Sequence, residues 1–318
     1  MRELMPPGTD GHIYRYLRLN KHDIKDLKTI YRTGPSSLPN DLTKDIKHWL
    51  LYLFYNSKLR LSTPKNFNDP YDCRVEFSND MSNRDLVRLV IAFFKNNSFS
   101  EPQKRKLRRK IGNKKLLEKI EGEYIKHPLN GPFSLPSIYL TSNDRSLLLE
   151  LCKPTLQNLV DGSRVICFAK IQDIPLMWAH YSDKHAGFCL EFDQKKLIES
   201  QIPVYKMEYT RTRPKINFSP KELLSLKTAI KILLTKSPEW SYEQEYRVIA
   251  GHTSFNNFDE NYQTFPPHAL TKIIFGFKMP EKYQKAIKTL VSSLGQYSAG
   301  FAIAKPNPYK YKIDIEDL

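Results

Sequence analysis

Apolar and polar residues alternate along several short stretches of the chain, which predicts β-strands because side chains on a strand point alternately to its two faces. The predicted strands are residues 12–17, 58–62, 165–169, 188–192, 240–249, 271–277, 299–304 and 309–315. Apolar residues at three- and four-residue spacings predict helices at about 22–32, 42–56, 144–160, 220–234 and 281–294, and more between 83 and 127. Strands in separate runs between unequal helices are typical of an α+β fold. No repeat or long linker divides the chain, so we expect a single α+β domain over residues 1–318.

The strand predicted at 240–249 carries a concentration of charge. On a strand, Glu243, Glu245 and Arg247 share one face. Unpaired charges are rarely tolerated inside a core, so we expect this face at the surface or lining a cleft. An ion pair between Arg247 and a neighbouring glutamate on a solvated edge would explain the same pattern.

Residues 83–127 read as a separate helical segment, which we interpret as an insertion into the sheet. The segment begins with an apolar stripe and becomes strongly basic over 104–119. Five of its cations are candidates for contacts with nucleic-acid phosphates: Lys104, Arg105, Lys106, Arg108 and Arg109. A solvated helix face is the alternative, and the segment lacks the interleaved aromatic residues that stack on single-stranded bases.

The overall charge is formally +16, from 50 Lys and Arg against 34 Asp and Glu, and it favours a polyanion such as nucleic acid as partner. No apolar run is long enough to span a membrane, and the first residues lack the apolar core of a signal peptide, so we expect a cytoplasmic protein without a membrane partner. The four cysteines are widely spaced, and His180 and His185 have no carboxylate or thiol at ligand spacing, so we expect no metal site. The glycine motifs of Rossmann and P-loop proteins, H-E-x-x-H and G-x-S-x-G are absent, which argues against those enzyme classes.

Four motifs resemble those of a bacterial family of unknown function: Y-[KR]-Y, S-x-P-x-x-F-N-D-P-[FY]-D, M-W-x-H-Y-x-x-x-H-x-G-x-C-L-E-F and E-x-E-[YW]-R. They correspond here to residues 14–16, 62–72, 177–192 and 243–247. The second motif is a turn rich in side chains that hydrogen-bond their own backbone, which predicts a structural role for Asn68, Asp69 and Asp72. The family resemblance by itself implies no activity.

A more distant resemblance does imply one. A basic residue on the first strand, Ser-Thr on the second, a helix with an aromatic residue before the third and E-x-E on a late strand are similar to the arrangement in ADP-ribosyltransferases. That resemblance implies a split β-sandwich core, with the helical segment as a basic insertion, and NAD as substrate. It also implies roles for Arg15 at the NAD phosphates, Ser62 and Thr63 at the nicotinamide ribose, Glu245 at the oxocarbenium ion and Glu243 facing the acceptor.

Three aromatic residues complete the expected cofactor site. We assign Tyr14, beside Arg15, and the helical Trp178 and Tyr181 to NAD binding. For Trp178 and Tyr181 the alternative is packing in the core.

Three functions stay open at this point. The first is an ADP-ribosyltransferase or NAD-cleaving effector, for example a toxin or anti-phage defence protein, acting on nucleic acid or on a protein and controlled by an antitoxin partner. The second is a non-catalytic nucleic-acid-binding protein that uses the basic helices. The third is a nuclease with Mg²⁺ held by Asp69, Asp72 and the two late glutamates.

Overall fold

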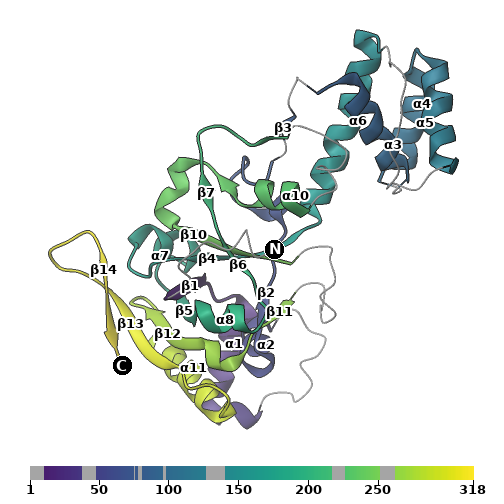
Figure 1. Cartoon of the computed structure of the whole chain (residues 1–318). Helices are drawn as coiled ribbons and strands as arrows, with labels where there is room; N and C mark the ends of the chain where they lie inside the picture. Colours follow the sequence, from purple (N-terminus) through teal and green to yellow (C-terminus); the bar gives the residue numbers. More distant parts are fainter. Residues whose placement is uncertain are drawn as a thin grey trace. The chain divides into compact units, whose positions relative to one another are not determined.

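A mixed eight-stranded sheet forms the centre of one of the two compact units of the chain (Figure 1). Its strands are hydrogen-bonded in the order β14-β13-β12-β5-β1-β4-β10-β6. Their bounds are β1 (His12–Leu17), β4 (Arg164–Ala169), β5 (Phe188–Asp193), β6 (Val204–Lys206), β10 (Glu245–Ala250), β12 (Leu270–Gly276), β13 (Gly300–Pro306) and β14 (Ile313–Asp317). The β12–β13 pair is parallel and the other neighbours are antiparallel. The expected α+β class is therefore confirmed, and the sheet does not close into a barrel within the described residues.

The computed structural model describes residues 11–37, 48–74, 76–77, 81–95, 98–126, 140–216, 226–250 and 262–318. Contacts group the chain into two units, and both are discontinuous in sequence. The first unit comprises Met1–Ser62, Arg164–Met207 and Pro238–Leu318, and the second comprises Thr63–Ser163 and Glu208–Ser237. The expected insertion at 83–127 falls within the second unit, although its residues 96–97 and 127 lie outside the described part.

Helices of the first unit pack on one face of the sheet and bury its larger core. They are α1 (Lys21–Thr33), α2 (Trp49–Asn56), α8 (Gln194–Glu199) and α11 (Glu281–Leu294). Helix α1 begins with a capping box, in which the Asn20 side chain accepts from the Asp23 backbone N–H and the Asp23 carboxylate accepts from that of Asn20. Its apolar residues Leu27 and Ile30 join the core, as three- and four-residue spacing requires.

The opposite face of this sheet carries a smaller core that is covered by α7 (Pro175–Tyr181). Met177 and Trp178 of α7 pack there with Tyr14 and Tyr16 of β1. Because side chains alternate along β1, Ile13 enters the larger core while its neighbour Tyr14 enters the smaller one. The short elements that complete the first unit are β2 (Lys58–Arg60), β11 (Tyr262–Thr264), η2 (Pro35–Ser37), η4 (Pro238–Glu243) and η5 (Pro267–Ala269).

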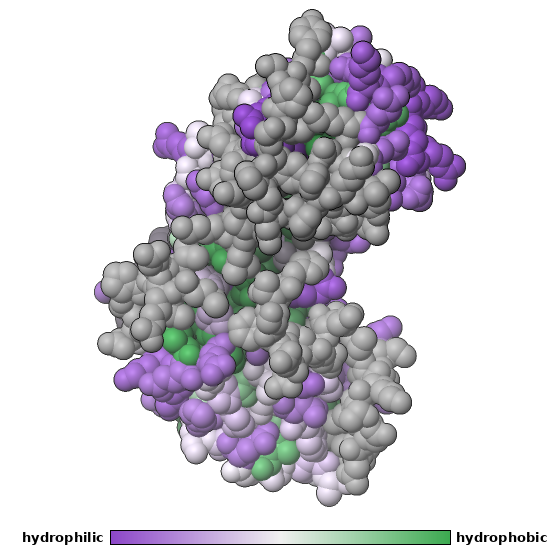
Figure 2. All heavy atoms as spheres, turned by 45° about the vertical axis from the view of Figure 1, so that its right-hand side comes forward, coloured by the Kyte–Doolittle hydropathy of each residue, from purple (hydrophilic) through white to green (hydrophobic). Residues whose placement is uncertain are grey.

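The second unit is mainly helical. Its helices are α3 (Asn83–Lys95), α4 (Glu101–Lys110), α5 (Lys114–Lys126), α6 (Ser142–Asp161), α10 (Leu226–Leu233) and η3 (Pro64–Asn66). Its two strand pairs, both parallel, are β3 (Glu76–Phe77) with β8 (Lys215–Ile216) and β7 (Glu208–Tyr209) with β9 (Thr235–Lys236). Helix α3 packs on α5 and α6, and α4 packs on α6. Figure 2 shows hydrophilic side chains gathered over the part of this unit that carries α4 and α5.

Candidate functional site

A row of four residues crosses the smaller-core face at the centre of the sheet. Tyr14 of β1 pairs with Glu191 of β5 on one side and with Ala169 of β4 on the other, and Ala169 pairs with Glu245 of β10. Directly paired residues in antiparallel strands point to the same face. Since neighbouring strands lie about 4.8 Å apart, the two carboxylate residues at the ends of the row are separated by roughly 14 Å of sheet. The small Ala169 lies between Tyr14 and Glu245.

Glu245 forms a buried, two-point ion pair with Arg247. The Arg247 Nε donates to Glu245 Oε1 at 2.6 Å and its Nη2 donates to Oε2 at 3.2 Å. Glu245 is 4% exposed and Arg247 is fully buried. Glu245 and Arg247 therefore share one face of the strand, as expected. That face is buried and is not a solvated edge. A pair desolvated to this degree is held in one orientation by its own hydrogen bonds.

Glu243 does not lie on the strand, contrary to the prediction at 240–249. Residues 238–243 form the 3₁₀ helix η4, and Gln244 has a left-handed backbone with φ of 42° before β10 begins at Glu245. The strand alternation invoked for Glu243 and Glu245 therefore does not apply. Glu243 is nevertheless buried, and its Oε1 accepts a 2.6 Å hydrogen bond from Tyr181 Oη of α7.

Arg15 lies beside the row but on the other face of the sheet. Its strand neighbour Tyr14 pairs with Glu191, whereas Arg15 itself pairs with Leu190, a member of the larger core. Its Nη1 donates to the backbone carbonyl of Cys167 in β4 at 2.6 Å. In the described structure β1 pairs with β4 at a single residue pair, Tyr14 and Ala169. The Arg15 guanidinium adds a second contact between the two strands by donating to the β4 backbone.

Ser62 extends the same edge of β4. It exchanges two backbone hydrogen bonds with Val165, at 2.8 and 2.9 Å, as an isolated antiparallel bridge. Between these contacts lies Cys167, and burial, reinforced by Glu245, raises the pKa of its thiol to about 12. Thr63 belongs to the second unit, where its carbonyl accepts from the Asn66 backbone N–H at 2.9 Å. Ser62 and Glu245 therefore belong to the first unit and Thr63 to the second.

Trp178 is a packed core residue, as the alternative interpretation held. It is fully buried, its ring meets Tyr16 edge-on at 5.2 Å, and its indole N–H donates to the Gln172 carbonyl at 2.7 Å. Tyr181 is half-buried and contacts Glu243. Of the aromatic residues assigned to NAD, Tyr14 and Tyr181 therefore contact site carboxylates, whereas Trp178 packs α7 onto the smaller core.

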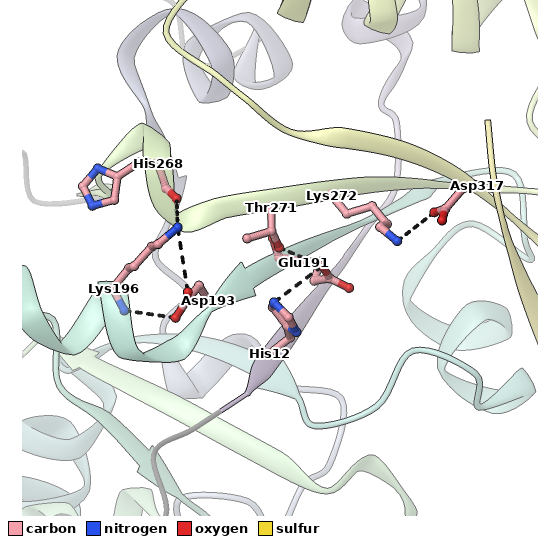
Figure 3. Close-up of polar contacts among 8 residues, drawn as sticks. All are labelled: His12, Glu191, Asp193, Lys196, His268, Thr271, Lys272 and Asp317. Atoms are coloured by element: carbon pink, nitrogen blue, oxygen red, sulfur yellow. Dashed lines mark hydrogen bonds and ion pairs between the residues drawn. The ribbon is translucent and has the colours of Figure 1, made fainter.

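Glu191 is the site residue that the sequence analysis missed. Its carboxylate accepts from Thr271 Oγ1 at 2.7 Å, and His12 Nε2 lies 3.9 Å from the same oxygen (Figure 3). Tyr14 also hydrogen-bonds Glu191, and burial, reinforced by that carboxylate, raises the pKa of the Tyr14 hydroxyl well above its usual range. A single carboxylate inside the apolar strand F-C-L-E-F was the available signal, because a charge there needs several partners.

An open groove of about 430 Å³ borders Tyr14. Its walls are residues 170–173, which follow β4, and residues 312–315, at the start of β14. Lys170 and Lys312 contribute positive charge and Asp173 and Asp314 negative charge, and Lys312 pairs with Asp314 at 2.9 Å. The Gln172 Oε1 atom is buried and has no hydrogen-bond partner in the described part of the chain. The volume is in the range of small-molecule sites, and a buried acceptor without a partner calls for an explanation such as a bound water or ion or a catalytic role.

The basic residues of α4 are partly neutralised by neighbouring carboxylates. Lys104 pairs with Glu101 at 2.9 Å, Arg108 pairs with Glu121 at 2.6 Å, and Lys106 pairs with Glu150. Arg105 and Arg109 are exposed and make no ion pair within the residues that the structure describes. Only part of the expected phosphate-binding face therefore presents uncompensated charge.

The carboxylates of the nuclease hypothesis are divided between the units. Asp69 and Asp72 belong to the second unit, and Glu243 and Glu245 to the first. Over the described ranges there is no group of three or more His, Cys, Asp or Glu side chains suited to hold a metal ion.

Comparisons with known proteins identify one family. Residues 177–248 match a family described as "Protein of unknown function (DUF2971)", so the chain contains a domain of that kind. The matched segment runs from α7 to β10 and includes Tyr181, Glu191, Glu243 and Glu245. Neither the curated proteins nor the solved structures gave a match, so the resemblance to ADP-ribosyltransferases receives no support from them. Within the described residues, no helix is long and apolar enough to cross a bilayer.

Proposed function

We propose that the first unit cleaves NAD at the bond between nicotinamide and ribose and passes ADP-ribose to water or to an acceptor. The observation that carries the proposal is the set of buried carboxylates Glu191, Glu243 and Glu245, on or beside the sheet face from which Tyr14 borders the groove. When this bond breaks, its electron pair leaves with nicotinamide and the ribose becomes an oxocarbenium ion. A fixed carboxylate in a water-poor site stabilises such a cation more effectively than water, because it needs no reorganisation.

In this proposal Glu245 is the catalytic carboxylate, and Arg247 is a positioning residue. The two hydrogen bonds from Arg247 fix both oxygens of Glu245. Glu243, held by Tyr181, faces the acceptor. The pyrophosphate of NAD lies against Lys170 and Lys312 in the groove, while Arg15 supports β4 from the other face.

The test is nicotinamide release by purified protein. Wild type should release nicotinamide, and Glu245→Gln should lower the rate by about two orders of magnitude or more, the loss typical of one preorganised electrostatic group. Glu243→Gln should reduce transfer more than hydrolysis. Glu281→Gln is the matched control, because Glu281 is an exposed residue of α11 paired only with Lys285 among the contacts described, and it should leave the rate unchanged.

Two results would reject the proposal. Wild-type protein that releases no nicotinamide with any nucleic-acid or protein acceptor would exclude NAD cleavage. Equal rates for wild type and Glu245→Gln, with both proteins folded, would remove Glu245 from the mechanism.

Nucleic-acid binding by α4 is a second candidate, and it is favoured by the exposed guanidinium groups of Arg105 and Arg109, which make no ion pair within the described part of the chain. It is compatible with the first, since a nucleic acid bound by the second unit could be the acceptor. Direct titration of a duplex at several salt concentrations tests it, because phosphate contacts release counterions and make affinity fall with salt.

A further inference from the structure

The second unit contains a pocket of about 220 Å³ whose charge is positive. Three segments contribute to its lining, with Tyr71, Cys73 and Arg74 from the first, residues 210–214 between β7 and β8, and Ile232 and residues 235–237 around β9. The described lining includes no Asp or Glu and four cations: Arg74, Arg211, Arg213 and Lys236. The hydroxyl groups of Thr210 and Thr212 are also in the wall. A concentration of cations around one cavity attracts an anionic ligand.

The turn F-N-D-P-Y-D builds one side of this pocket. The Asp69 carboxylate accepts from the Tyr71 backbone N–H at 2.8 Å, and the Asp69 carbonyl accepts from the Asp72 N–H at 3.3 Å. Cys73 then takes a left-handed backbone with φ of 57°. These contacts direct the chain so that Tyr71, Cys73 and Arg74 all reach the cavity. The structural role expected for Asp69 and Asp72 is thus that of supporting a site.

Carboxylates behind the lining hold the cations in place. Asp72 lies 3.8 Å from the Nζ of Lys236, whose side chain is nearly inaccessible to solvent. Arg74 pairs with Asp161 at 3.4 Å and Arg213 pairs with Glu76 at 3.5 Å. Such second partners orient a basic side chain toward a ligand without occupying the cavity.

Two further cationic features face the pocket. Arg211 is exposed and makes no ion pair within the described residues. The Arg213 guanidinium also lies 5.6 Å from the centre of the Tyr71 ring, which restricts its orientation. Arg211 therefore adds to the lining a positive charge that no carboxylate of the described residues pairs with.

We infer that this pocket binds the phosphate group of a small phosphorylated molecule. Arginine guanidinium groups donate two parallel hydrogen bonds to phosphate oxygens, and threonine hydroxyls supply neutral donors to the same group. The cavity is smaller than the usual range for drug-sized ligands, which suits one phosphate with the rest of its molecule outside. The exposed ring of Tyr71 at the pocket provides a surface for that remainder. This inference is independent of the NAD chemistry proposed for the first unit.

Isothermal titration calorimetry on the full chain at about 150 mM salt, which screens long-range attraction, tests the inference. Inorganic phosphate and adenosine 5′-monophosphate should both bind, and adenosine should not. Binding of adenosine as tight as that of the monophosphate, with no binding of inorganic phosphate, would show that the nucleoside is recognised instead of the phosphate and would overturn the inference.

Variants identify the location of binding. Arg211→Gln and Arg74→Gln should each weaken binding of both phosphate ligands by about tenfold or more, the change that corresponds to 1.4 kcal/mol. Lys115→Gln removes the same charge from an exposed position of α5 outside the pocket and should leave affinity unchanged. Arg211→Gln is the more informative change, because Arg211 supports no other contact described. An equal loss in Lys115→Gln, or no heat with either phosphate ligand, would refute the inference.

Discussion

Removing either member of the Glu245–Arg247 pair should strongly destabilise the first unit. Both side chains are almost completely inaccessible, and two hydrogen bonds of 2.6 and 3.2 Å join them. Loss of one partner removes the opposite charge that a buried group is paired with here, which costs about 3–5 kcal/mol. We therefore expect Arg247→Met and Glu245→Gln each to lower the free energy of unfolding by roughly that amount.

The double variant separates pairing from burial. Once both charges are gone, no buried charge is left without a partner, so Glu245→Gln combined with Arg247→Met should cost little more than either single change. The coupling between the two positions should then be about 3 kcal/mol. Two residues far apart would instead give additive losses.

Urea unfolding followed by tryptophan fluorescence measures the relevant unit. The chain has three tryptophans, Trp49, Trp178 and Trp240, and all lie in segments of the first unit. Fluorescence therefore reports this unit and avoids treating the two-unit chain as one transition. The control variant Glu281→Gln should have the same urea midpoint of unfolding as wild type. Losses below about 1 kcal/mol in both single variants, or strict additivity in the double, would show that the pair is not the buried contact described above.

Two other predictions concern α1 and α4. Burial, opposed by backbone hydrogen bonds from Asn20 and Leu50, raises the pKa of Asp23 from 3.8 to about 6. The folded state then binds the proton more tightly than the unfolded state, so this stabilisation is complete below pH 3.8 and is lost as pH rises through about 6. Asp23→Asn should accordingly gain stability relative to wild type between pH 4 and pH 7, by up to about 3 kcal/mol, and a difference independent of pH in urea unfolding would contradict the assignment. On α4, replacing Arg105 and Arg109 with Ser should weaken duplex binding and reduce its salt dependence. The same replacement of Lys104 and Lys106 should have a smaller effect, because their charges are already paired. Equal effects in the titration would contradict this prediction and mean that the ion pairs open on binding.

The sequence predicted correctly those strands whose pattern of apolar and polar residues is visible within the strand itself. The strand expected at 12–17 is β1, and the strand expected at 188–192 is β5 within one residue, because alternation and a continuous apolar run are visible in a short window. The strand expected at 240–249 begins five residues late, since the left-handed Gln244 and the 3₁₀ turn before it are set by packing.

Long-range contacts were beyond the reach of the same patterns. Glu191 joins the candidate site only because the register of β1 against β5 places it opposite Tyr14. Similarly, the pairing of Lys106 with Glu150 and of Arg108 with Glu121 depends on how the helices pack. The sequence therefore predicted five cations for phosphate contacts, whereas only Arg105 and Arg109 of these five make no ion pair in the described structure. A chain-wide count of charge gives the class of partner but not the side chains that are available to it.

The interleaving of the two units imposes an order on synthesis. The chain passes between them four times, at 62/63, 163/164, 207/208 and 237/238. When β6 leaves the ribosome its sheet neighbour β10 has not been made, because residues 207 to 244 come first. At roughly 5–20 residues per second this delay lasts about 2–8 s. During that interval β4 exposes the edge that β10 will cover, so the nascent protein presents an unpaired strand that a chaperone could protect or that a neighbouring nascent chain could capture.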